Sequence, residues 1–145
     1  MARGDVVVFE EAKAKMLDGD WASTDHFYVA ICDDTATPIA AFETPTLGDF
    51  TEVGDAGTYV TGGTDLGTLA TLVAEAAGTM TFDSATNPSW AQDALNDVDA
   101  YWGIIYNYTD AAHDAVAFVD LGGPVDMTAG DLTITWNGSG IFTIA

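Results

Sequence analysis

The stretch from residue 98 to residue 108 constrains the fold of this 145-residue chain more than any other. Every second residue in it is apolar or aromatic: Val98, Ala100, Trp102, Ile104, Tyr106 and Tyr108. A period of two is typical of a β-strand with one buried face, because successive side chains of a strand point to opposite sides. The stretch therefore predicts a strand within an antiparallel sheet.

The rest of the last third, residues 97–145, continues this β pattern. Leu132, Ile134 and Trp136 again alternate with polar residues. Residues 137–140 read Asn-Gly-Ser-Gly and predict a tight turn into a terminal strand, since Asn and Gly accept the positive φ that tight hairpins require. We expect four consecutive antiparallel strands joined by short turns.

Shorter patterns occupy the first two thirds of the chain. Apolar residues at helical spacing predict a short helix over residues 8–17, and the apolar run at 26–32 predicts a strand buried on both faces. Further expected elements are strands at 39–42, 58–61 and 79–82, and a turn or helical segment that begins at residue 87. Residues 69–75 are strand-like or helical, and the flanking Thr and Gly favour a strand.

Length and composition predict one compact domain with a real core. The chain is 48% hydrophobic, which excludes compositional disorder, and its nineteen threonines and sixteen aromatic residues favour strands. We expect a mostly β, antiparallel sandwich or barrel-like domain over residues 21–145, preceded by an N-terminal arm or short helix in residues 1–20. A long irregular loop is expected at about 33–57; such loops are often functional or wrap a neighbour.

The charge distribution is extreme. Arg3, Lys13 and Lys15 are the only strong cations, whereas residues 16–145 contain twenty Asp or Glu and carry the whole net charge of −20. Such a body repels nucleic-acid phosphates and anionic membrane surfaces, so neither is expected as a partner. Repulsion among the carboxylates weakens the fold at low salt and is screened in saline conditions. The alternative interpretation is simply a very soluble acidic surface.

The residues that usually carry chemistry form no recognisable pattern. His26 and His113 are far apart and lack companion cysteines, which argues against a zinc site. Cys32 lies in an apolar run, where a buried inert thiol is expected. The serines have no recognisable nucleophile elbow, and the acidic pairs fit no calcium-binding loop. The sequence therefore predicts no catalytic residue, no metal and no cofactor.

Several segments of the last 60 residues together resemble small virion structural proteins of tailed bacteriophages, some of which decorate the capsid as cement proteins. The segments that carry the resemblance are Asn87-Pro88-Ser89-Trp90, Ala100-Tyr101-Trp102-Gly103-Ile104-Ile105-Tyr106-Asn107, Ala117-Phe118-Val119-Asp120-Leu121-Gly122-Gly123, Gly130-Asp131-Leu132-Thr133-Ile134-Thr135-Trp136 and Gly140-Ile141-Phe142. These are strand and turn patterns and not catalytic signatures.

The resemblance implies a non-enzymatic protein, made in the host cytoplasm, that binds the outside of the phage head. It implies the major capsid protein as partner, bridging of neighbouring shell subunits, and self-association, with a trimer favoured. A docking surface needs apolar anchors and complementary polar groups. The candidates lie in the N-terminal arm and the long loop: Arg3, Phe9, Lys13, Lys15, Phe42 and Phe50. A helix that docks on its own domain is the equally weighted alternative for the arm.

Two other functions remain open at this point. A phage tail component, such as a tube, fibre or adaptor protein, belongs to the same structural class. A carbohydrate- or calcium-binding module belongs to a different one, and in it an exposed Trp90, Trp102 or Trp136 would stack on sugar rings. All three tryptophans are also explained as core residues.

Overall fold

The computed structural model describes residues 1–144 and confirms a mostly β, antiparallel architecture with a short N-terminal helix. Strands account for 36% of the chain and helices for 11%. The largest sheet stays open and does not close into a barrel, so of the two predicted architectures the layered one describes this fold.

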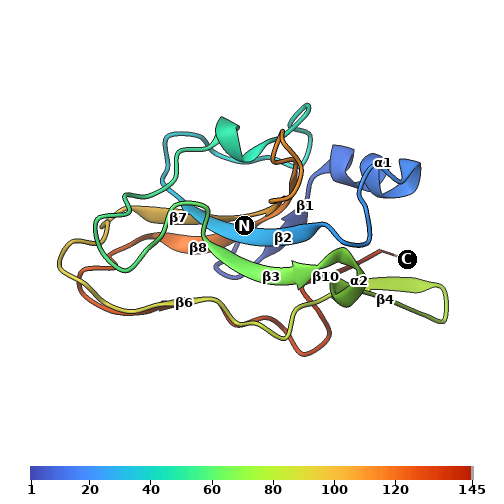
Figure 1. Cartoon of the computed structure of the whole chain (residues 1–145). Helices are drawn as coiled ribbons and strands as arrows, with labels where there is room; N and C mark the ends of the chain where they lie inside the picture. The colour runs from blue at the N-terminus through green and yellow to red at the C-terminus, as the bar shows by residue number, and fades with distance from the viewer. Residues whose placement is uncertain (145) are drawn as a thin grey trace.

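Five antiparallel strands form the central sheet that runs across the molecule (Figure 1). In spatial order they are β1 (Val6–Val8), β8 (Ala115–Val125), β7 (Ala100–Asn107), β2 (His26–Cys32) and β3 (Thr64–Thr68). The predicted strand at 26–32 is confirmed, and the hairpin of β7 and β8 is the part of the last third that folds as the sequence predicts.

Strand β7 lies at the centre of this sheet and is buried on both faces, whereas the alternation predicted only one buried face. Trp102 packs edge-on against Phe118 on one face. On the other face, a Cβ added to Gly103 would lie 3.3 Å from the side chain of Ile134. Both faces of the sheet are covered by other parts of the chain. The alternation along β7 therefore indicates which of the two covering layers a residue contacts, and not whether the residue is buried.

One covering layer consists of the long connection between β2 and β3 together with helix α1 (Glu10–Asp18). The connection is folded: it contains the 3-10 helix η1 (Leu47–Asp49), and single bridges join Cys32 to Glu52 and Thr46 to Asp114. Figure 1 shows η1 and this connection above the sheet, with α1 to one side. The long irregular segment thus serves as part of the protein's own structure.

The other layer is made of short strands on the opposite side of the central sheet (Figure 1). They are β4 (Val73–Ala76), β5 (Thr79–Phe82) and β10 (Phe142–Ile144) in one sheet, and β6 (Ser89–Trp90) with β9 (Leu132–Thr133) in another. Strands β9 and β10 do not pair with each other, so the predicted terminal hairpin is wrong. Their partners come from earlier in the chain, since β9 pairs with β6 and β10 pairs with β5.

Four shorter predictions also need correction. A strand was favoured over a helix for residues 69–75, but the segment contains both, since α2 (Leu69–Leu72) precedes β4. Residues 39–42 and 58–61 contain no strand, and the segment from residue 87 forms β6 first and turns only at residues 94–95. Residues 58 and 59 are held instead by the buried side chain of Asn96, whose Oδ1 accepts a hydrogen bond from Thr58 N over 2.7 Å.

Helix α1 follows β1 directly, and both belong to the domain. The strand β1 pairs with β8, so residues 6–8 form an edge of the central sheet and not a separate arm. The helix begins at Glu10, later than predicted, because Val8 is still part of β1. Its acidic first turn is favourable at the positive end of the helix dipole, and it ends at Gly19 in the left-handed conformation.

Candidate functional site

The N-terminal residues proposed from the sequence as partner contacts divide into exposed and internal groups. Arg3 and Lys13 are exposed, whereas Phe9 is completely buried. Lys15 is engaged inside the molecule: its Nζ lies 2.6 Å from Asp114 Oδ2, and Trp21 Nε1 donates to the same oxygen. The hydrogen bond to Asp114 raises the pKa of Lys15 above its ordinary value. Of these residues, Arg3 and Lys13 are the ones available to a partner.

The two phenylalanines of the long loop pack against the N-terminal segment. Phe42 lies against Phe50 with ring centres 5.7 Å apart, Phe50 stacks on Phe9 at 6.2 Å, and Phe9 packs on Phe118 of β8 at 5.1 Å. Phe50 is buried and Phe42 is half-buried. This chain of rings fastens the loop and the helix to the sheet, and burying each ring contributes roughly 1.5–3 kcal/mol.

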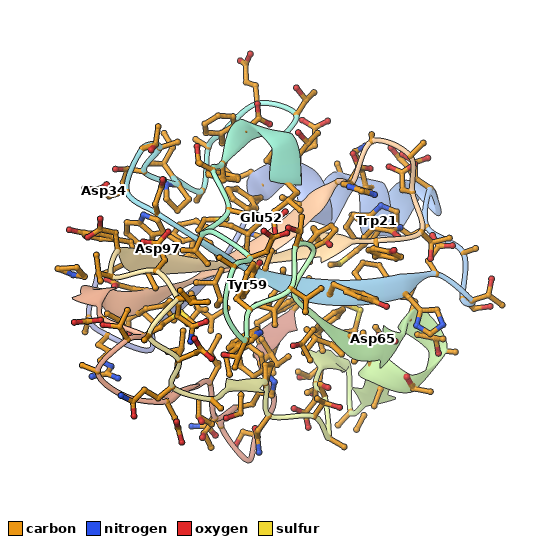
Figure 2. The ribbon with its side chains drawn as sticks, turned by 60° about the vertical axis from the view of Figure 1, so that its left-hand side comes forward. Trp21, Asp34, Glu52, Tyr59, Asp65 and Asp97 are labelled. Carbon is orange, nitrogen blue, oxygen red and sulfur yellow. The ribbon has the colours of Figure 1, made fainter. Side chains whose placement is uncertain are left out.

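A second set of contacts joins the long connection between β2 and β3 to strand β2. The Oη of the buried Tyr59 donates a hydrogen bond to Glu52 Oε2 over 2.6 Å and accepts one from Ile31 N over 3.1 Å (Figure 2). Gly62 N donates to the same carboxylate oxygen at 2.7 Å. Burial, followed by the hydrogen bond to Glu52, raises the pKa of Tyr59 well above its ordinary value. Glu52 is thus a structural carboxylate.

The residues that could carry catalysis or bind a metal are placed as follows. Cys32 is completely buried, as expected, and burial raises the pKa of its thiol, which disfavours the nucleophilic thiolate. No group of three or more His, Cys, Asp or Glu side chains among residues 1–144 is placed to hold a metal ion. Within residues 1–144, no helix has both the length and the apolar character needed to span a membrane.

The tryptophans considered as sugar platforms belong to the packing of the domain. Trp90 is 5% exposed and Trp136 is 9% exposed. Trp136 Nε1 also donates to Thr86 O, and the half-buried Trp102 packs against Phe118. A sugar ring stacked on Trp90 or Trp136 would require these side chains to leave the core, which removes the observation that favoured this function.

A groove of about 590 Å³ lies beside Arg3, between β1, β8 and residues 132–142. Buried apolar side chains such as Leu121 and Ile134 form part of its lining. The titratable groups in it are Arg3, Asp5 and Asp120; its described lining contains no histidine, cysteine or serine.

A group of stacked rings, which the sequence did not single out, lies where β2 begins and β7 ends; Tyr108 is exposed, whereas Tyr28 and His113 are half-buried. Tyr108 stacks on Tyr28 with ring centres 4.1 Å apart and on His113 at 5.8 Å, with interplanar angles of 17° and 13°. The buried Tyr106 packs against Tyr108 and His113. We call Tyr28, Tyr108 and His113 the aromatic platform.

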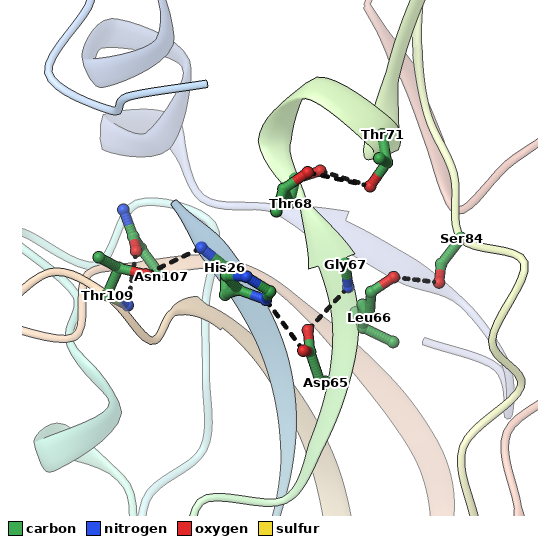
Figure 3. Close-up of polar contacts among 9 residues, drawn as sticks. All are labelled: His26, Asp65, Leu66, Gly67, Thr68, Thr71, Ser84, Asn107 and Thr109. Atoms are coloured by element: carbon green, nitrogen blue, oxygen red, sulfur yellow. Dashed lines mark hydrogen bonds and ion pairs between the residues drawn. The ribbon is translucent and has the colours of Figure 1, made fainter. Parts of the chain in front are cut away.

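Polar contacts from β2 and β3 hold the platform in place. Tyr108 N donates to His26 O, and His26 N donates to Thr109 Oγ1, each over 2.9 Å. His26 Nδ1 donates to Asp65 Oδ2 over 2.9 Å, and Gly67 N donates to Asp65 Oδ1 over 2.8 Å (Figure 3). Asp65 is the cross-strand neighbour of Tyr28, so a carboxylate borders the platform.

The residues of this surface were visible in the sequence but were interpreted differently. Tyr108 was assigned to the buried face because it continues the alternation of β7, but it follows the last residue of that strand and is 46% exposed. The two histidines were set aside because they are distant in sequence. The fold brings both to the same end of the sheet, His26 on β2 and His113 in the turn between β7 and β8.

Comparison of the chain with protein-family models, with curated proteins and with solved structures found no match.

Proposed function

We propose that this protein is a non-enzymatic structural protein of a tailed-phage virion, a capsid decoration protein that binds the outer surface of the head and stabilises it by bridging capsid subunits. The observation that carries the proposal is the resemblance of segments between residues 87 and 142 to small phage virion proteins. Those segments coincide with strands β6, β7, β8 and β9 and the start of β10.

The position of these segments supports the proposal at the level of the fold. Strands β7 and β8 form the centre of the main sheet, and β6, β9 and β10 build the layer against it. The resemblance therefore concerns the residues that hold the domain together. No contact residue is transferred by the resemblance.

The absence of a metal-ligating cluster among residues 1–144 is compatible with such a role. A protein that cements a shell needs a stable fold and a binding surface, and it needs no nucleophile, metal or cofactor. The net charge of −20 keeps free copies soluble, because like-charged copies repel one another until a complementary surface binds them. We propose the major capsid protein as that surface and a homotrimer as the assembled form.

Co-sedimentation with separated phage parts tests this proposal. Heads that lack the protein and purified tails, both from the phage that encodes the chain, are each mixed with it at near-seawater ionic strength and pelleted. A decoration protein pellets with heads to a saturating ratio and stays in solution with tails. Binding to tails alone would replace the proposal with the tail-component function, and binding to neither would remove both.

Light scattering with mass determination tests the assembly state separately. The chain has a mass of 15.2 kDa, and the proposal predicts a discrete species of three chains, either free in saline solution or released from heads. A stable monomer that still saturates heads would keep the decoration function and remove the trimer.

A further inference from the structure

The aromatic platform is partly accessible in the folded protein, since Tyr28 and His113 are half-buried. Tyr108 is 46% exposed, and the side chains of His26 and Asp65 beside it are 46% and 41% exposed. The long connection that covers much of this sheet face reaches the border of the platform: a Cβ added to Gly62, in the last turn of that connection, would lie 3.9 Å from the Tyr108 ring. The platform is thus a surface of stacked rings bordered by the loop and by β3.

The chemistry of this surface is that of hydroxyls and a carboxylate around aromatic rings. Burial, followed by the nearby carboxylate of Asp65, raises the pKa of Tyr28, so its hydroxyl stays protonated at neutral pH. The Asp65 carboxylate accepts hydrogen bonds from His26 and Gly67. Tyrosine is, with tryptophan and arginine, enriched among the residues that dominate binding energy in protein interfaces.

The charge of the surrounding surface determines which partner it attracts. Residues 16–144 contain no Lys or Arg, so every strong charge on β2, β3 and β7 is negative. A negatively charged partner would be repelled and a positively charged one attracted. Arginine fits best, because its planar guanidinium stacks on aromatic rings and pairs with a carboxylate through two hydrogen bonds.

We propose that the aromatic platform and Asp65 form the docking site for a basic segment of a partner protein, with an arginine side chain placed between the Tyr28 ring and the Asp65 carboxylate. The inference deepens the proposed function, on which it rests for the identity of the partner, since it states the chemistry by which the capsid surface would be recognised. Its first test needs no capsid.

The stacking within the platform argues for a cationic side chain over a sugar. Tyr108 already has two near-parallel neighbours at 4.1 and 5.8 Å, so it offers its edge and hydroxyl more than an open ring face. A pyranose ring needs an open face to stack on. Tyr108 covers one face of Tyr28 as well, and beside that ring a guanidinium, unlike a neutral sugar, gains an ionic contact with the Asp65 carboxylate.

A titration followed by nuclear magnetic resonance tests the site. Amide shifts of the ¹⁵N-labelled protein are followed while a peptide of alternating arginine and glycine is added at near-seawater ionic strength, which suppresses unspecific attraction to the acidic surface. The expected shifts concentrate on Tyr28, Asp65 and Tyr108. Shifts spread evenly over the acidic surface would overturn the proposal, as would shifts at the platform caused by neutral oligosaccharides and not by the peptide.

Two variants and a matched control make the test quantitative. Tyr108→Ala removes the central ring and Asp65→Asn removes the charge while keeping a hydrogen-bonding side chain; each is expected to weaken peptide binding at least about fivefold. Asp34→Asn makes the same change of charge at an exposed residue on the other side of the molecule (Figure 2), and it should weaken binding less than about twofold. Equal effects of Asp65→Asn and Asp34→Asn would overturn the proposal.

The same variants separate this inference from the proposed function. If the wild-type protein saturates heads and Tyr108→Ala and Asp65→Asn do so with unchanged affinity, the decoration function stands and the docking site is wrong. If the peptide binds the platform but the protein ignores heads, the docking site stands and the capsid is not the partner.

Discussion

Lys15 Nζ and Asp114 Oδ2 lie 2.6 Å apart and join helix α1 to the residue that precedes β8. Asp114 is buried, and its other donor is Trp21 Nε1 at 3.4 Å. One of the three cations of the chain is therefore used to hold the N-terminal helix on the domain. This contact explains why the N-terminal segment behaves as part of the fold and not as a free arm.

Replacing Lys15 with Met should lower the free energy of unfolding by about 1–3 kcal/mol, because the buried Asp114 carboxylate loses its charged donor. Urea unfolding measures the change. Lys13→Met removes the same charge from an exposed position of the same helix and should change stability by less than about 0.5 kcal/mol. Equal effects of the two substitutions would show that the ion pair is not what holds the helix.

Removing the hydroxyl of Tyr59 should loosen the long connection between β2 and β3. Tyr59→Phe leaves Glu52 without its 2.6 Å donor and Ile31 N without an acceptor, which costs about 1–3 kcal/mol. Hydrogen exchange should accelerate selectively at residues 50–63. The control is Tyr101→Phe, whose hydroxyl has no hydrogen-bond partner among the described residues; faster exchange in both variants would contradict the assignment.

Stability should fall in alkaline solution. Burial raises the pKa values of Tyr59 and Tyr106 above the ordinary value of about 10, so the folded chain keeps protons that the unfolded chain releases. Their contribution is complete below about pH 10 and is lost as the pH rises from there towards the folded pKa values, by up to about 1.4 kcal/mol per pH unit for each group. Lys15 acts in the same direction, since its pKa is also raised.

Urea midpoints measured between about pH 9 and about pH 11 test this dependence. The wild-type midpoint should fall steeply over this range, and that of Tyr106→Phe should fall less steeply because one buried hydroxyl is absent. A midpoint that stays level in the wild-type protein would mean that these tyrosines ionise freely in the folded state.

Gly63 is required where the long connection returns to the sheet. Its φ is +78°, and a Cβ there would lie 1.9 Å from Val29 O, so Gly63→Ala should destabilise the protein by more than about 3 kcal/mol or prevent folding. Gly138→Ala is the matched control, because a Cβ at that position meets nothing within 4 Å. Circular dichroism melting compares the two, and a folded, stable Gly63→Ala variant would refute the close approach.

Salt should stabilise the protein. Residues 16–145 contain twenty Asp or Glu and no Lys or Arg, so their carboxylates repel one another. Raising the ionic strength from about 0.02 M to about 0.5 M screens this repulsion. We expect the free energy of unfolding to rise by on the order of 1 kcal/mol, with sodium and potassium chloride acting alike. The Lys15–Asp114 pair opposes this trend but is one contact against twenty charges. A fall in stability with salt would show that attractive pairs dominate.

Much of the central sheet could be predicted from sequence, because its strands carry strong local patterns. The apolar run at β2 and the alternation at β7 are properties of neighbouring residues. The partners of β9 and β10 are distant in sequence: Ile134 N donates to Pro88 O, and Ile141 N donates to Phe82 O. No pattern within residues 132–144 reveals those distant partners, so a terminal hairpin was the natural but wrong prediction.

The surface was harder to predict than the core. Phe9 and Phe50 were selected as contact anchors because large apolar side chains serve interfaces and cores alike, and only the packing of Phe9 on Phe118 distinguishes the two uses. Conversely, Tyr108 was assigned to a buried face. Its exposure follows from the end of β7 at Asn107, and the boundary of a strand is the feature that a single sequence specifies least well.

The temperature at which heads release their DNA tests the central claim most directly. Heads that lack the protein are heated with increasing amounts of it, and release is followed by the fluorescence of a DNA-binding dye. The proposed function predicts that the release temperature rises with occupancy and levels off when the heads are saturated. An unchanged release temperature at saturating occupancy would contradict a stabilising role on the capsid.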